Sequence, residues 1–142
     1  MLSLRKPSKE LIDRWLEEQR SRSLNCREVC GTRDGPLPRG YNVDRNSILL
    51  GHGEATYLRA VAAIRGLHMW DFDWLELCWP TVPIEVGSVL ATLTWQWGAW
   101  YLNSCHIVYV IDEQTSGRQF GFGYGTIEGH VEYGEERFSV EW

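Results

Sequence analysis

Apolar residues recur with a helical period at two places in the first half of the chain. Ser8 is a residue type that caps helix N-termini, so we expect a first helix from Ser8 to about Ser21. A second predicted helix begins near Gly53 or Glu54 and ends near Gly66. The residues between them, 23–47, are rich in glycine and proline, which is typical of a loop. The two apolar faces comprise Leu11, Ile12, Trp15 and Leu16 in the first helix, and Tyr57, Leu58, Val61, Ala62 and Ile64 in the second.

The second half of the chain alternates between apolar and polar positions, which is typical of strands in an antiparallel sheet. A strand over about 104–111 is apolar on both faces, so we expect both of its faces to be covered. A hairpin loop over 112–118 and strands near 120–125 and 138–142 complete the pattern. The sequence thus predicts an α+β fold, with two N-terminal helices and a curved antiparallel β-meander. In the strand that follows Gly87, one face is expected to carry Val89, Ala91, Leu93, Trp95 and Trp97.

The strand near 120–125 has aromatic residues on one face and glycine at every position of the other. Glycine weakens a strand, so three glycines at alternate positions require either a bulky group packed on them or a sharp bend. Trp95 and Trp97 on a neighbouring strand are the residues we expect to fill that space. The chain has eight tryptophans, and its rings either form the core or line an apolar ligand cavity. The candidate cavity residues are Trp79, Trp95, Trp97, Phe120, Phe122 and Tyr124.

Length and charge narrow the class of protein. The chain has 142 residues, which is the size of one domain, and its net charge of -5 argues against a nucleic-acid partner. Residues 86–111 lack charged side chains and are long enough to cross a bilayer, but their polar groups recur with period two, so we expect strands and no membrane span. No apolar signal segment follows Met1, so we expect a cytoplasmic protein with reduced thiols at Cys26, Cys30, Cys78 and Cys105.

Three features are candidates for chemistry. Glu128, His130 and Glu132 are spaced at two and would share one face of a strand, where they could hold a metal, act in acid–base chemistry or form an ordinary solvent face. His106 lies among apolar neighbours and is expected to be a hydrogen-bonded, buried histidine. The turn Gly51-His52-Gly53 lacks the further glycines and the nearby cation of a phosphate loop, so it is interpreted as a tight turn. We expect no metal and no cofactor.

Five stretches of the chain form distinctive motifs: Leu50-Gly51-His52-Gly53 through Tyr57, Trp70 through Trp74, Pro80 through Gly87, Gly121 through His130, and Gly134 through Val140. These motifs resemble those of DUF1990, a family of uncharacterised proteins from bacteria and plants. The resemblance extends over 41–142 and is looser over 1–40, so residues 1–142 are expected to form a single domain of this kind. It implies a fold similar to the START-like helix-grip domains, without the long C-terminal helix that family members usually have. It implies no catalytic residue.

Three functions therefore stay open. The first is a binding domain that holds a small apolar or amphipathic ligand between sheet and helix. The second is an interaction or homo-oligomerisation module that uses an exposed apolar face. The third is an enzyme with Glu128 and His130 as acid and base. For the first, the predicted site residues are Trp95, Trp97, His106, Phe122, Tyr124 and His130.

Overall fold

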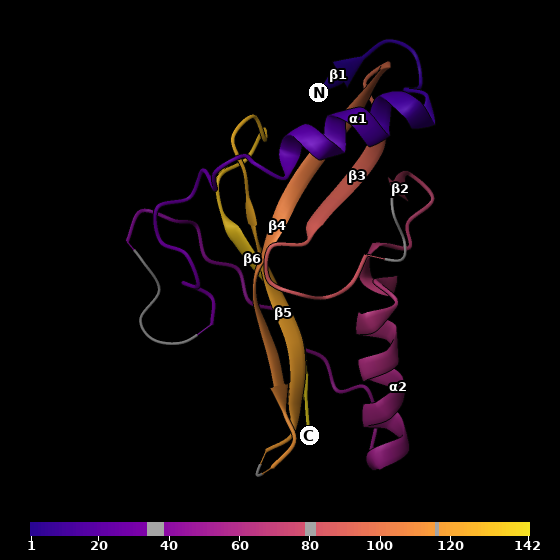
Figure 1. Ribbon diagram of the computed structural model, residues 1–142. Coiled ribbons are helices and arrows are strands. Elements are labelled where there is room, and N and C mark those ends of the chain that lie inside the picture. The colour runs from indigo at the N-terminus through magenta and orange to yellow at the C-terminus, as the bar shows by residue number, and fades with distance from the viewer. Residues whose placement is uncertain (34–38, 79–81, 116) are drawn as a thin grey trace.

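The computed structural model describes residues 1–33, 39–78, 82–115 and 117–142. Trp79 and Pro80, which the sequence analysis uses, lie outside these ranges. Within them the chain forms two α-helices, one short 3-10 helix and a six-stranded sheet (Figure 1). The elements are β1 (Leu2–Ser3), α1 (Lys9–Gln19), α2 (Glu54–Arg65), η1 (His68–Trp70), β2 (Leu75–Leu77), β3 (Val89–Gln96), β4 (Ala99–Glu113), β5 (Gln119–Thr126) and β6 (Glu135–Glu141). The predicted α+β class is confirmed, and the likeness to helix-grip domains stays a prediction.

The long strand β4 organises the sheet. All its pairings are antiparallel, in the order β2-β3-β4-β5-β6, and β1 pairs with the beginning of β4. β3 pairs with the first half of β4, from Ala99 to His106, and β5 pairs with the second half. The uncharged residues 86–111 therefore lie mostly in β3 and β4, as their period-two pattern predicts. Among the described residues no helix is long and apolar enough to cross a membrane.

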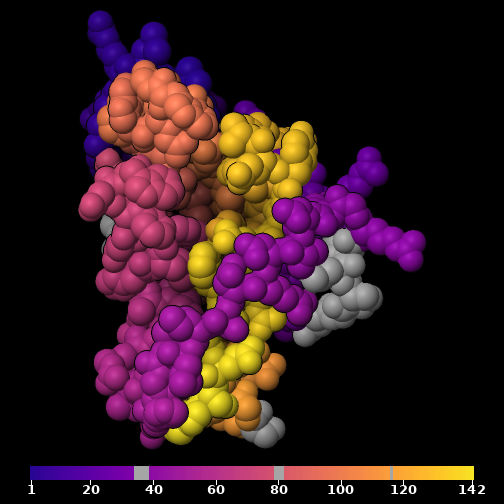
Figure 2. Space-filling model, turned by 180° about the vertical axis from the view of Figure 1, so that it is seen from behind, coloured from indigo at the N-terminus to yellow at the C-terminus, as the bar shows by residue number. Residues whose placement is uncertain are grey.

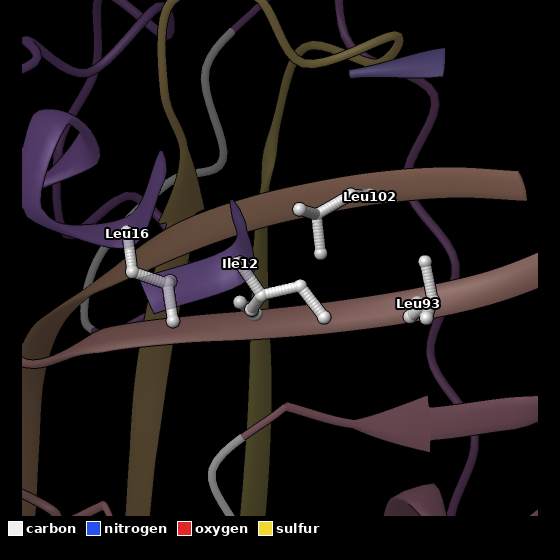
Figure 3. Close-up of a cluster of buried hydrophobic side chains, with 5 residues drawn as sticks. Ile12, Leu16, Leu93 and Leu102 are labelled. Atoms are coloured by element: carbon white, nitrogen blue, oxygen red, sulfur yellow. The ribbon is translucent and has the colours of Figure 1, made fainter. Parts of the chain in front are cut away.

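The helix α1 covers one face of the sheet beside β3 and β4. The Ser8 hydroxyl accepts a hydrogen bond from the Leu11 amide and caps the helix, as predicted. Figure 3 shows that Ile12 and Leu16 point toward Leu93 and Leu102 on the sheet. Burial of each such side chain stabilises the fold by roughly 1.5–3 kcal/mol.

The helix α2 and η1 cover the opposite face. Gly53 and Gly66 cap α2, so the second helix is confirmed with its predicted ends. The Trp70 ring makes edge contacts with Phe122, Tyr124 and Phe138, at centroid distances of 6.3, 5.3 and 6.0 Å. Both faces of β4 and β5 are thus covered, as the two-sided apolar pattern of 107–111 predicts. The buried members of this second cluster are Leu67, Leu90, Ile107 and Phe122.

Tyr109 covers the middle of the glycine face of β5, Gly121 lies against Phe138 and Ser139 of β6, and the predicted filling by Trp95 and Trp97 is wrong. The register of β4 against β5 shifts between Ile107 and Tyr109, and this β-bulge places the Tyr109 ring over Gly123. A Cβ atom on Gly123 would lie 2.3 Å from that ring. The next glycine, Gly125, is covered by Leu24 and Cys26 from the segment that follows α1.

A carboxylate fixes that segment on the sheet. Glu135 of β6 accepts hydrogen bonds from the amides of Cys30, at 2.6 Å, and Thr32, at 2.8 Å. The Thr32 hydroxyl bonds to the same carboxylate and also lies 2.6 Å from the hydroxyl of Tyr109. A charged acceptor with several donors makes strong hydrogen bonds, so this network holds the loop against β4, β5 and β6.

Two further details differ from the sequence prediction. Trp97 is outside the strand, because Gln96 pairs with Ala99 and leaves Trp97 and Gly98 as a two-residue turn. Residues 128–132 are also not a strand, since they belong to the turn between β5 and β6. The prediction that Glu128 and His130 share one face of a strand is therefore wrong.

Candidate functional site

A cavity of about 230 Å³ lies between α1, β4 and the β5–β6 turn. Most of its lining is polar, and the partly exposed apolar residues in it are Met1 and Trp15, because Leu102 of β4 is fully buried behind them. It is thus a space between helix and sheet whose lining combines polar and apolar groups. The full lining is Met1, Trp15, Gln19, Arg22, Leu102, Asn103, Ser104, Glu128, Gly129 and His130.

The helix α1 presents Trp15 and Gln19 to the cavity from successive turns, because residues four apart share a helix face. Gln19 is buried, and its side-chain amide donates to the Trp15 carbonyl at 3.1 Å. The Gln19 carbonyl lies 3.0 Å from a ring nitrogen of His106 on β4. His106 is hydrogen-bonded, as predicted, but it is half-buried where a buried ring was expected, and it connects the end of α1 to the sheet.

The β5–β6 turn is held in place by hydrogen bonds at its base and in its middle. The Arg22 guanidinium donates to the Glu128 carbonyl at 3.0 Å, and the Glu128 amide donates to the Ser23 carbonyl at 3.0 Å. Gly129 has φ +89°, a conformation that favours glycine, and the His130 amide bonds back to Ile127. The turn thereby brings Arg22 and His130 to the same cavity.

The hydrogen bond that the His130 ring accepts defines its protonation state. The Glu132 amide donates to His130 Nδ1 at 3.0 Å, so Nδ1 carries a lone pair and the proton of the neutral ring is on Nε2. Burial lowers the pKa of His130, although the Glu132 carboxylate opposes this shift. The ring is therefore neutral near pH 7 and keeps an N–H donor at Nε2.

The predicted site residues fall into three separate places. His130 lines the cavity, and His106 contacts its Gln19 wall. Phe122 and Tyr124 pack with Trp70 on the opposite face of the sheet, where the Tyr124 hydroxyl donates to Glu136. Trp95 and Trp97 lie at the far end of the β3–β4 hairpin, against Trp100 and Tyr101.

The sequence analysis missed the residues that α1 and β4 bring to the cavity, chiefly Trp15, Gln19 and Asn103. Trp15 and Gln19 are more than eighty positions away from Asn103, and no local motif marks the two segments as neighbours. Four arginines lie close together in the sequence, at positions 20, 22, 27 and 33, but of these only Arg22 lines the cavity.

The thiols and metal-binding residue types form no second site in the described part of the chain. All four cysteines are unpaired thiols, as predicted. Burial raises the pKa of Cys78 and of Cys105 to about 12, which makes them poor nucleophiles. No group of three His, Cys, Asp or Glu side chains among the described residues could hold a metal ion.

Comparison with known proteins places the chain in a family. The family described as a domain of unknown function, DUF1990, matches residues 25–142. The chain belongs to DUF1990. It is 35% identical to a UPF0548 protein of Dictyostelium discoideum, over all of this chain and 71% of that protein. It is 31% identical to a UPF0548 protein of Deinococcus radiodurans, over 99% of this chain and 75% of the relative.

A UPF0548 protein of Arabidopsis thaliana is 30% identical over 72% of this chain and 51% of its own length. No solved structure matches the chain. The DUF1990 match includes Leu102 and His130 but begins after Trp15, Gln19 and Arg22. The similarity to the Dictyostelium protein extends over all five positions, so both sides of the cavity fall within a region of shared sequence.

Proposed function

We propose that this DUF1990 domain binds a small amphipathic molecule in the cavity between α1 and β4. The observation that carries the proposal is the division of the lining. Met1 and Trp15 can contact the apolar part of a ligand, while Arg22 and His130 offer polar groups. Ligand sites commonly combine apolar walls with a few fixed polar groups in this way.

The polar groups favour a ligand whose head accepts hydrogen bonds. Neutral His130 offers a donor at Nε2, and Arg22 has donors besides the one that it uses on Glu128. The volume of about 230 Å³ admits a molecule at or below the lower end of drug size. A cytoplasmic location is part of the same proposal and is supported by the four unpaired thiols.

The first test is native mass spectrometry of the gently purified protein, with its denatured mass for comparison. A bound ligand gives an extra mass that disappears on denaturation. A second measurement uses anilinonaphthalene sulfonate, an anionic amphipathic probe, whose fluorescence we expect to rise on binding. His130→Ala should weaken probe binding about tenfold, since it removes a hydrogen bond to a charged group. His52→Ala, a change at a surface histidine, should not.

The proposal fails if no extra mass appears and the probe binds equally to both histidine variants and the unmodified protein. A mass twice that of the chain would favour the homo-oligomerisation module. A second candidate function is acid–base catalysis by Glu128 and His130, because both residues line the same cavity. That function requires a substrate that is converted, so bound material recovered chemically unchanged after long incubation would count against it.

A further inference from the structure

The β3–β4 hairpin exposes a tryptophan in a strained conformation. The Trp97 side chain is 91% exposed, and its backbone has φ +48° in the turn with Gly98 at φ +80°. Two positive φ values in a two-residue hairpin turn define the type I′ geometry, for which Asn-Gly is the preferred sequence. A bulky residue there is rare, and the edge contact with Tyr101 still leaves nearly all of the Trp97 surface in solvent. Such an outlier points to a contact outside the chain.

Other exposed apolar side chains surround this turn. β1 pairs with β4 at Tyr101, which places the N-terminal residues beside the hairpin, and Leu2 and Leu4 are 60% and 79% exposed. Trp95 is 46% exposed. In Figure 2 the orange residues of the hairpin lie near the upper end of the molecule, beside the indigo N-terminal residues that project above them. The turn, Leu2, Leu4 and Trp95 together make one apolar end, which we call the hairpin end.

The charges at the hairpin end differ from those of the rest of the chain. Residues 86–111 have no charged side chain, so the hairpin itself is uncharged. Residues 1–9 carry Arg5, Lys6 and Lys9 and none of the chain's 19 carboxylates, although the net charge of the chain is -5. Lys6 and Lys9 form ion pairs with Glu76 and Asp13, which leaves Arg5 as the cation most directly placed to meet an anion.

The arrangement of the rings favours a lipid surface over a sugar. Trp95 and Trp100 are inclined at 51°, and Trp97 is perpendicular to Tyr101 at 89°, so the rings form no flat platform on which a sugar could stack. Tryptophan and tyrosine prefer the interface between membrane and water, where one part of the ring is apolar and the other is wet. Leucines beside them and a basic segment next to them are features of peripheral membrane contacts.

We propose that the hairpin end docks on the surface of an anionic lipid bilayer, with Trp97 inserted at the level of the headgroups. This contact goes beyond the ligand proposed for the α1–β4 cavity and does not depend on it. It requires no membrane-spanning segment, because the aromatic and leucine side chains enter only the interfacial layer.

The test is sedimentation of the whole chain with phosphatidylcholine vesicles, with and without phosphatidylserine. The decisive variant is Trp97→Asn, which creates the preferred Asn-Gly turn and is expected to be at least as stable as the unmodified protein. It should lower the partition coefficient roughly tenfold or more, since a tryptophan side chain is no longer buried. Trp142→Asn removes an exposed tryptophan at the other end of the sheet (Figure 1) and should keep full binding.

Arg5→Gln should reduce binding to vesicles with phosphatidylserine and leave binding to pure phosphatidylcholine unchanged. The proposal is overturned if the unmodified protein binds neither kind of vesicle, or if Trp97→Asn binds as strongly as the unmodified protein. It is also overturned if the chain self-associates through Trp97 in light scattering while ignoring vesicles, since the hairpin end would then contact a second copy.

Discussion

Replacement of Gly123 by alanine tests how closely the Tyr109 ring covers the glycine face of β5. The added methyl carbon would lie 2.3 Å from Cε1, 2.4 Å from Cζ and 2.7 Å from the hydroxyl oxygen of Tyr109. An ordinary contact begins at 3.4 Å, so the ring or the strand must move by about 1 Å. The ring cannot move easily, because it is 2% exposed and its hydroxyl bonds to Thr32.

The expected loss follows from these contacts. Overpacking in a core costs about 1–3 kcal/mol. Displacement of the ring also weakens the hydrogen bond to Thr32, which contributes about 1 kcal/mol. We therefore expect Gly123→Ala to lower the free energy of unfolding by about 2–4 kcal/mol, measured by urea denaturation at constant pH.

Two comparisons make this result specific. Gly134→Ala adds the same methyl where no atom lies within 4 Å, and it should change stability by less than about 0.5 kcal/mol. In a Tyr109→Ala background the steric cause is gone, so Gly123→Ala should cost less than about 1 kcal/mol. Equal costs with and without the tyrosine ring would refute this explanation of the glycine face.

Three further predictions concern buried polar groups. Tyr57→Phe should leave the free energy of unfolding unchanged or raise it by up to about 1 kcal/mol, because the buried Tyr57 hydroxyl has no hydrogen-bond partner; a loss above that in urea denaturation would reveal one. Glu135→Gln should cost about 2–3 kcal/mol and speed labelling of Cys30 by a thiol reagent, since the charged acceptor for the Cys30 and Thr32 amides is lost; unchanged labelling would contradict this. His130 has a lowered pKa in the folded state, so the unfolded chain binds more protons as pH falls below about 6.5, and this residue's contribution to stability should decline there. His130→Gln should make the free energy of unfolding depend less on pH in that range. The same pH dependence in the variant and the unmodified protein would argue against a neutral, half-buried ring.

Local patterns predicted much of the fold. Ser8 before an apolar stripe indicated the start of α1, and Gly53 and Gly66 indicated both ends of α2. These features depend on neighbouring residues and are therefore readable from sequence. The sequence wrongly predicted that Trp97 belongs to the strand after Gly87. A two-residue turn does not interrupt the alternation of apolar and polar residues, so the end of the strand could not be recognised.

The β-bulge and the cavity depend on partners that are distant in the sequence. The bulge at Val108 changes which residues of β4 face the glycines of β5. No residue type in 107–109 indicates a bulge in the sequence. His130 and Glu128 could be selected as polar residues of interest, but their neighbours Trp15 and Leu102 come from other elements. The sequence could therefore name one side of the candidate site and not the other.

The network around Glu135 has a consequence for protein synthesis. The bonds that hold Cys30 and Thr32 join residues 105 and 103 positions apart, and Ile12 and Leu16 depend on strands that follow residue 88. A chain that leaves the ribosome N-terminus first must therefore carry α1 without its native covering until β4 has been made, and the segment around Cys30 and Thr32 until β6 has been made. Such late, non-local pairing slows folding and leaves apolar segments accessible meanwhile. We expect the nascent chain to engage chaperones at α1, well before the sheet closes.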